Sequence, residues 1–163
     1  TCTAPNDYTV SKRMLSSFVS SYKHDFTHWH FYIPTIYGAG ENPKRLIPYV
    51  INAIRNGEEL HFTAGDQTRQ YVHVSEVPRM LAQAFDKNLP SGLYNIQGKE
   101  TVTVKEIVTE IHHAMGKEVP DGCFGSVQRA DVGMKYLALD GKKLHDATGF
   151  EARIKITDVI DTY

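Results

Sequence analysis

Several features are scarce or missing in this sequence of 163 residues. The two cysteines, Cys2 and Cys123, cannot form a disulfide framework, and neither has a Cys or His neighbour at metal-ligand spacing. The 18 basic residues are balanced by 19 acidic ones, so the strong positive potential of a nucleic-acid or membrane-surface binder is absent. No apolar run approaches the ~20 residues of a membrane helix, and no signal-peptide layout is present. These absences predict a soluble, cytoplasmic protein that binds neither nucleic acid nor membranes.

The 12 glycines form no dinucleotide-binding fingerprint. Neither Gly-x-Gly-x-x-Gly nor Gly-x-x-Gly-x-x-Gly occurs, so no turn in the sequence is suited to seat a cofactor pyrophosphate on a helix N-terminus. What is present, 41% hydrophobic and 23% charged residues, is the composition of an ordinary globular domain.

Apolar periodicity predicts alternating helices and strands, and therefore an α/β or α+β class. Helices are expected over 8–22, 46–56, a segment capped by Ser75, 103–116, 140–148 and 157–163. Strands are expected over 28–33, 60–63, 71–74, 93–96 and 136–139. Segments 34–45 and 64–70 are expected to be a loop and a turn. Thr103 and Glu106 have the spacing of a capping box, and Gly57 and Gly149 are suited to end helices.

Tyr8 and Lys12 lie four residues apart near the start of the first expected helix. Both side chains then project from one face and can converge on one bound molecule. A phenol beside an ammonium can exchange a proton with a sugar or alcohol hydroxyl. Chance placement gives about 0.6 such pairs in a chain of this length, so the pair taken alone favours a solvated helix face over a catalytic site.

A cluster of histidines and a run of aromatic residues are weaker candidates for a functional site. His24, His28 and His30 lie close together, but no carboxylate-rich set accompanies them, and no metal site is expected. The aromatic run over residues 29–32 is interpreted as a packed strand, because no basic stripe surrounds it.

Several motifs occur in the order and spacing of one family. They are YTVSK at 8–12, IPTIYGAG at 33–40, RLIP at 45–48 and GDQTRQYVHV at 65–74, followed by matches at 92–96, 129–131 and 139–143. Taken together, they cover almost the whole chain. The sequence resembles the extended short-chain dehydrogenases/reductases, specifically their nucleotide-sugar epimerase/dehydratase group.

This resemblance implies roles for individual residues. Tyr8 would be the acid/base that moves a proton at a sugar hydroxyl while NAD or NADP takes or returns a hydride, with Lys12 tuning the acidity of Tyr8. The implied cofactor-binding residues are Tyr8, Lys12, Pro34, Ile36 and Tyr37. The implied substrate-binding residues are Thr35, Arg45, Leu46, Ile47, Gln67, Arg69 and Arg129. Of these, Arg69 and Arg129 would hold the substrate pyrophosphate with planar guanidinium groups, in a cleft that Tyr8 and Lys12 also face.

The same resemblance bears on domain organisation. Residues 1–163 are expected to be the C-terminal portion of such an enzyme: the end of a Rossmann-type doubly wound α/β fold plus the small substrate-binding α/β domain. A dinucleotide-binding N-terminal half is expected to be absent from these residues, because the sequence starts without Met and reaches a helical pattern within ten residues. The chain alone is therefore expected to be inactive and to expose apolar faces that its other half covers. The complete enzyme is expected to be a homodimer.

Several residues depart from the family pattern, and these departures leave the subfamily unassigned. Thr9 stands where Gly is usual, Gln70 where Asp is usual, and Ser75-Glu76 where an acidic pair is common. Three reactions of a nucleotide-activated sugar stay open: epimerisation, dehydration and 4-ketoreduction. Of these, the reaction of a 4-epimerase or a 4-ketoreductase is preferred. The expected setting is carbohydrate or lipopolysaccharide synthesis. One alternative is a non-catalytic module that binds a sugar nucleotide or a partner protein. Another is an unrelated α/β domain with coincidental motifs.

Overall fold

The computed structural model describes residues 6–21, 25–128 and 134–163. The elements in chain order are α1 (Asp7–Ser21), β1 (Trp29–Tyr32), β2 (Thr35–Tyr37), α2 (Leu46–Asn56), β3 (Thr68–His73), α3 (Glu76–Asp86), β4 (Gly92–Asn95), β5 (Glu100–Thr103), α4 (Val104–Ala114), β6 (Tyr136–Leu137), α5 (Lys142–Thr148) and the 3-10 turns η1 (Ile156–Asp158) and η2 (Ile160–Thr162). Helices alternate with mostly parallel strands, which confirms the α/β class.

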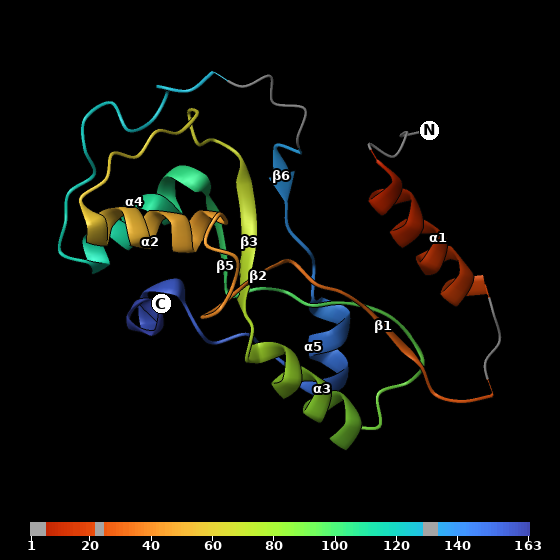
Figure 1. Ribbon diagram of the computed structural model, residues 1–163. Helices are drawn as coiled ribbons and strands as arrows, with labels where there is room; N and C mark the ends of the chain where they lie inside the picture. Colours follow the sequence, from red (N-terminus) through yellow and green to blue (C-terminus); the bar gives the residue numbers. More distant parts are fainter. Residues whose placement is uncertain (1–5, 22–24, 129–133) are drawn as a thin grey trace.

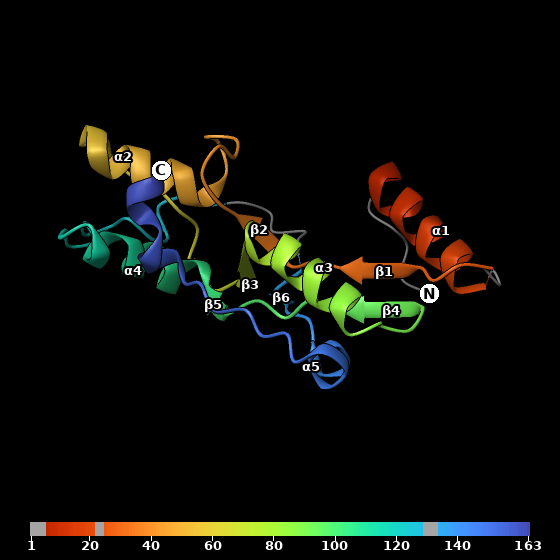
Figure 2. The same ribbon diagram turned by 90° about the horizontal axis from the view of Figure 1, so that it is seen from below.

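The strands form two small sheets. β1 pairs with β4 in parallel, and β3 is the centre of the second sheet, parallel to β2 and β6 and antiparallel to β5. The β1–β4 sheet has α3 and α5 nearby, whereas α2 and α4 lie beside the other sheet (Figures 1 and 2). The chain passes from β1 in the first sheet to β2 in the second through Ile33 and Pro34 alone.

Each sheet has its own apolar core. The larger core joins the inner faces of α2 and α4, including Val50, Ile51 and Ile107, to residues of the C-terminal 3-10 turns. The smaller one packs α3 and α5 against β4, and Trp29 and Phe31 of the aromatic run pack at its edge. The aromatic run, expected in the core, thus packs only in part, because Tyr32 is exposed.

Local signals set several helix ends. The Asn6 side chain accepts a hydrogen bond from the Thr9 backbone N–H at 2.9 Å and so caps α1. Thr103 and Glu106 form both bonds of the expected capping box. Gly57 and Gly149 adopt the left-handed conformation that ends α2 and α5.

Several expected elements were wrong. Residues 35–37, expected in a loop, form β2, and β5 occupies residues for which no strand was expected. Segment 60–63 forms only an isolated bridge from Phe62 to Phe124, and the C-terminal segment forms 3-10 turns. Ser75 precedes α3, but its hydroxyl lies 2.8 Å from His73 Nδ1 and does not cap the helix.

Helix α1 stands out because none of its residues is buried. It touches β1 through Ser16 Oγ, 3.1 Å from His30 Nε2. Val10, Met14 and Phe18, at helical spacing, form an exposed apolar stripe that we call the α1 stripe. Within the described ranges, no helix has both the length and the apolar character needed to cross a membrane.

Candidate functional site

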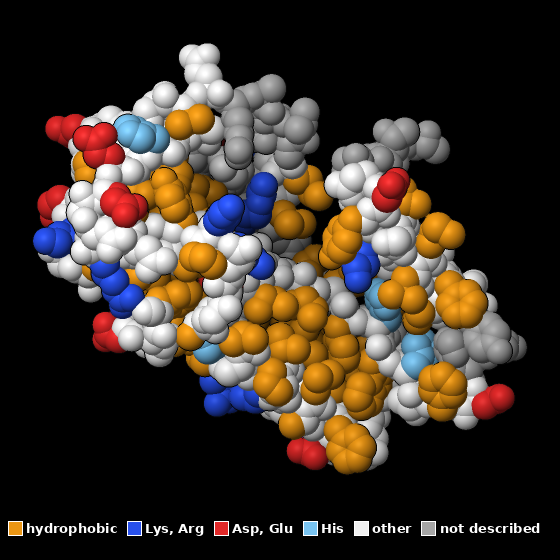
Figure 3. All heavy atoms as spheres, in the orientation of Figure 1, with side chains coloured by type: hydrophobic (Ala, Val, Ile, Leu, Met, Phe, Trp, Pro, Cys, Tyr) orange, Lys and Arg blue, Asp and Glu red, His pale blue; other side chains and the backbone are white. Residues whose placement is uncertain are grey.

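A cavity of about 850 Å³ lies where the start of α2 meets β2 and β3. Its walls come from segments far apart in the chain. They are residues Thr35, Ile36, Glu41, Lys44, Arg45, Leu46, Ile47, Tyr49, His61, Phe62, Thr63, Gln67, Arg69, Tyr71, Val104 and Val127. In Figure 3, basic side chains gather at this place, where α2 begins beside β3.

The cavity collects most of the expected substrate-binding residues. Six of the seven line it: Thr35, Arg45, Leu46, Ile47, Gln67 and Arg69. The seventh, Arg129, lies outside the described residues. Of the expected cofactor residues, Ile36 lines the cavity, whereas Pro34 does not and Tyr37 is buried, its hydroxyl donating to the Ile154 carbonyl at 3.0 Å.

Two guanidinium groups reach the cavity from different elements. Arg69, on β3, donates from Nη1 to the Thr68 carbonyl at 2.8 Å. Arg45, just before α2, donates from Nη2 to the Ile36 carbonyl at 3.1 Å, and its Nε lies 3.1 Å from a Glu41 carboxylate oxygen. A guanidinium has five N–H donors, so these contacts leave donors on both side chains for an anionic ligand.

Tyr71 lies in the cavity wall between these charges. Burial raises the pKa of Tyr71 to about 12, although the positive charges of Arg69 and Arg45 oppose the shift. The phenol is therefore neutral at physiological pH, which makes Tyr71 unsuited as a general base. It can still donate or accept a hydrogen bond.

One wall of the cavity is aromatic. The rings of Tyr49 and Phe62 meet edge to face at 6.2 Å, and Phe62 stacks on Phe124 at 5.7 Å. Lys105 Nζ lies 5.6 Å from the centre of the Phe124 ring. Sequence reasoning missed this wall, because Tyr49, Phe62 and Phe124 come from three separate segments that only the fold brings together.

Tyr8 and Lys12 lie together but away from this cavity. Lys12 Nζ is 5.4 Å from the centre of the Tyr8 ring, and the Tyr8 side chain is exposed. Neither lines the cavity that contains Arg69, contrary to the arrangement implied by the resemblance. The physical reason is the sparse packing of α1, which has no buried residue and lies apart from α2 and β3 in both ribbon views (Figures 1 and 2).

The histidines form no metal centre in the part of the chain that is described. His30 contacts Ser16, and no group of three or more His, Cys, Asp or Glu residues there is arranged to hold an ion. His24 and Cys2 lie outside the described residues, and Cys123 is a buried free thiol.

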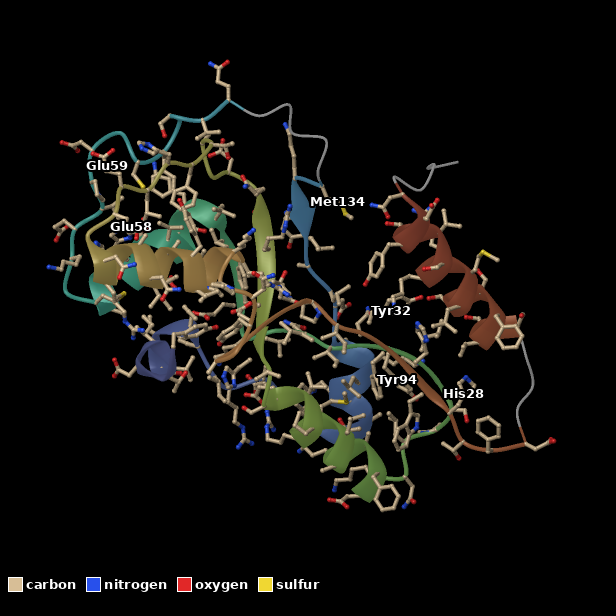
Figure 4. All side chains as sticks on the ribbon, viewed as in Figure 1. His28, Tyr32, Glu58, Glu59, Tyr94 and Met134 are labelled. Atoms are coloured by element: carbon tan, nitrogen blue, oxygen red, sulfur yellow. The ribbon has the colours of Figure 1, made fainter. Side chains whose placement is uncertain are left out.

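Figure 4 labels residues on opposite sides of the molecule. Glu58 and Glu59 follow α2 at one end of the molecule, whereas His28 and Tyr32 lie on or next to β1 towards α1 (Figure 4). Met134, just before β6, lies on the side of the molecule that faces α1.

A family model described as "NAD dependent epimerase/dehydratase family" matches residues 2–96. Among curated proteins, the CDP-abequose synthase of Salmonella typhimurium is 22% identical over 147 residues, which cover 84% of this chain and 48% of that protein. The dTDP-glucose 4,6-dehydratase of Escherichia coli is 27% identical over 126 residues, 71% of this chain and 33% of that protein. The chain thus spans between a third and a half of the length of these relatives.

Solved structures match nearly the whole chain. One is a dTDP-glucose 4,6-dehydratase from Bacillus anthracis in complex with NAD, with a TM-score of 0.79, 21% identity and coverage of 100% of this chain and 54% of that one. Another is a UDP-N-acetylglucosamine 4-epimerase from Methanobrevibacter ruminantium in complex with UDP-N-acetylmuramic acid, with a TM-score of 0.79, 18% identity and coverage of 98% and 53%. At these identities the likeness establishes the shared fold.

Proposed function

Because the chain belongs to the NAD dependent epimerase/dehydratase family, we propose that it supplies the substrate-binding part of an enzyme that modifies a nucleotide-activated sugar with NAD or NADP. The cavity next to Arg45 and Arg69 holds the nucleoside diphosphate of that substrate. One observation carries this proposal: six residues expected to bind substrate, from three separate segments, line a single cavity.

The properties of the cavity match such a ligand. Its volume of about 850 Å³ is within the range of small-molecule sites, ~300–1,000 Å³. Two guanidinium groups suit a diphosphate, since each can bond two oxygens at once. The aromatic wall of Tyr49 and Phe62 gives a flat nucleobase a surface for packing.

Tyr8 and Lys12 are the proposed acid/base pair. A bound NAD or NADP would accept a hydride from a sugar carbon and later return it or pass it on. As a phenolate, Tyr8 would take the proton of the hydroxyl on that carbon through its Oη, and the Lys12 ammonium, 5.4 Å from the centre of the Tyr8 ring, would stabilise that phenolate before the transfer. Exposure of both groups on α1 fits a site that is completed by further polypeptide.

The described residues fit only one side of a dinucleotide site. Pro34, Ile36 and Tyr37 follow β1 and enter β2, where they would border the nicotinamide end, but no Gly-rich turn for the pyrophosphate occurs in the sequence. We therefore propose that residues 1–163 act with a separate dinucleotide-binding half. β1 pairs only with β4 among the described strands, and its other edge, next to α1, can accept a parallel strand of that half.

Nucleotide binding tests the role of the cavity. Titration calorimetry of the 163-residue chain with UDP, dTDP and CDP should show binding of at least one of them, and the Arg69→Ala variant should bind it more weakly. Binding of the nucleoside alone should be weaker but survive the substitution, since it lacks the diphosphate. A folded wild-type chain that binds none of the three would overturn the proposal.

A non-catalytic module that binds a sugar nucleotide is the second candidate. It is favoured by the position of Tyr8 and Lys12, which do not line the cavity. Turnover measured with the dinucleotide-binding half present, and its loss in the Tyr8→Phe variant, distinguishes the enzyme from the module.

A further inference from the structure

Glu41 occupies an unusual position at the cavity. It comes from the segment between β2 and α2, and only 13% of its side chain is exposed although it carries a charge. Its Oε2 lies 3.1 Å from Arg45 Nε, and its Oε1 accepts a bond from the Tyr163 hydroxyl at 2.7 Å and a long one from the Gly38 backbone N–H at 3.4 Å. Each carboxylate oxygen therefore has a partner.

Arg45 is held on one side only. Its Nε meets Glu41 and its Nη2 donates to the Ile36 carbonyl, while about half of the side chain is exposed. Both Nη1 hydrogens and the second Nη2 hydrogen are not used by these contacts. An arginine free to rotate would lose conformational entropy on binding an anion, and contacts that fix it beforehand remove part of that cost.

Tyr163 is itself anchored. Its carbonyl accepts from Arg55 Nη1 at 2.5 Å, which ties the end of the C-terminal turns to α2. Burial, and then the negative charge of Glu41, raise the pKa of Tyr163 well above its usual value. The hydroxyl thus keeps its proton and remains a donor to Glu41 at physiological pH.

We propose that Glu41 is a positioning residue that, held by Tyr163, orients the Arg45 guanidinium for the diphosphate of the substrate. This inference rests on the proposed function of the cavity. Glu41 does not itself contact the ligand, because a carboxylate repels a phosphate. It acts through Arg45, and Tyr163 acts through Glu41.

Charge and geometry make opposite predictions for this site. Removing a carboxylate raises the local positive potential, which by itself tightens binding of a diphosphate. Removing the contact that fixes Arg45 weakens binding. The sign of the effect of Glu41→Gln therefore separates a positioning role from a purely electrostatic one.

The test measures binding of UDP, dTDP and CDP, and of the nucleosides uridine, thymidine and cytidine, to the 163-residue chain by calorimetry or NMR titration. We expect Glu41→Gln to weaken binding of the preferred diphosphate about 3- to 10-fold, the effect of releasing one rotamer-rich side chain, and to leave its nucleoside unaffected. Tyr163→Phe should shift binding in the same direction by less. Glu41→Asp, which keeps the charge but shortens the reach, should resemble Glu41→Gln. Glu58→Gln, outside the cavity, is the matched control.

A double-mutant cycle with Arg45→Ala distinguishes a positioning role of Glu41 from a merely structural one, because only the positioning role depends on Arg45. If Glu41 acts through Arg45, Glu41→Gln has no further effect in the Arg45→Ala background. Unchanged or tighter diphosphate binding in Glu41→Gln overturns the inference, as does an equal loss in both backgrounds or a parallel loss of nucleoside binding. A folded wild-type chain that binds none of UDP, dTDP and CDP overturns the proposed function, and this inference with it, whereas the other outcomes leave the proposed function intact.

Discussion

The ammonium nitrogen of Lys12 lies 5.4 Å from the centre of the Tyr8 ring, on a helix that has no buried residue and does not border the Arg69 cavity. The proposed proton chemistry and the proposed nucleotide binding thus reside in separate parts of the chain. Variants of one part should leave the other unaffected, which makes the two proposals testable independently.

Tyr8→Phe removes the proposed acid/base hydroxyl and keeps the ring. With the dinucleotide-binding half present, we expect kcat to fall roughly 100- to 10,000-fold, the usual contribution of a positioned acid/base, with nucleoside diphosphate affinity unchanged. Steady-state kinetics and calorimetry measure the two effects. Tyr136→Phe, which removes an exposed hydroxyl from β6, is the control. Wild-type turnover in Tyr8→Phe would exclude the acid/base role.

Arg69→Ala should weaken nucleoside diphosphate binding about 10- to 100-fold, because a hydrogen bond to a charged group contributes ~1.5–3 kcal/mol. Arg69→Lys should recover only part of the loss, since an ammonium cannot bond two oxygens in a fixed plane. Arg153→Ala, with an exposed side chain outside the cavity, is the control. Full affinity in Arg69→Ala would move the diphosphate site elsewhere.

The environment of Glu76 leads us to expect that the free energy of unfolding depends on pH. This carboxylate is 2% exposed and accepts backbone N–H bonds from Arg153 at 2.7 Å and Ile154 at 3.1 Å, with a further bond from Arg79. Burial alone would raise the pKa of Glu76, but the bonds from Arg153, Arg79 and Ile154 outweigh it and hold the pKa below its usual value. Its stabilisation is therefore fully present above the unfolded-state pKa of ~4.3 and is lost as the pH falls through the lower folded-state pKa.

Glu76→Gln should accordingly lower the free energy of unfolding by about 2–4 kcal/mol at pH 7, because it weakens a buried, hydrogen-bonded ion pair. The difference from wild type should shrink as the pH falls through the folded-state pKa of Glu76, because the wild-type carboxyl is then protonated as well. Urea unfolding between pH 3 and 7 measures it, with the exposed Glu118→Gln as control. A difference independent of pH would show that the charge of Glu76 contributes nothing.

The exposed apolar surfaces should make the chain self-associate when it is alone. These surfaces are the α1 stripe and a patch around α3 with Val74, Leu81 and Phe85, seen in Figure 3 as a continuous apolar area. Light scattering should show species larger than the monomer, and Phe18→Lys with Phe85→Lys should reduce them. Ala147→Lys, which adds a charge at an exposed position of α5, should leave these species unchanged. A strictly monomeric wild-type chain would contradict the prediction that another half covers these faces.

Local sequence patterns predicted what local contacts determine. The capping box at Thr103 and the terminating Gly57 depend on residues three to five positions away, and both were correct. Strand β2 was missed because its three residues are a strand only through pairing with residues 71–73. Short pairings of this kind leave no periodicity in the sequence.

The cavity could be predicted only in part. Motif order located Arg45, Gln67 and Arg69, which the structure brings together. Glu41 went unnoticed because its partner Tyr163 is 122 positions away, and no pattern in one sequence connects two such residues. The packing of α1 was beyond prediction for a different reason: helical periodicity tells which residues share a face but not what that face meets.

The Tyr37 hydroxyl donates a hydrogen bond to the Ile154 carbonyl, and the Tyr163 hydroxyl donates one to Glu41. Each bond joins residues that are more than 110 positions apart. A ribosome that adds ~5–20 residues per second therefore delivers Ile154 and Tyr163 roughly 6 to 24 s after Tyr37 and Glu41. In that interval the nascent chain holds Glu41 without the Tyr163 hydroxyl that bonds it. The proposed orientation of Arg45 by a fixed Glu41 is therefore completed only after Tyr163 has left the exit tunnel.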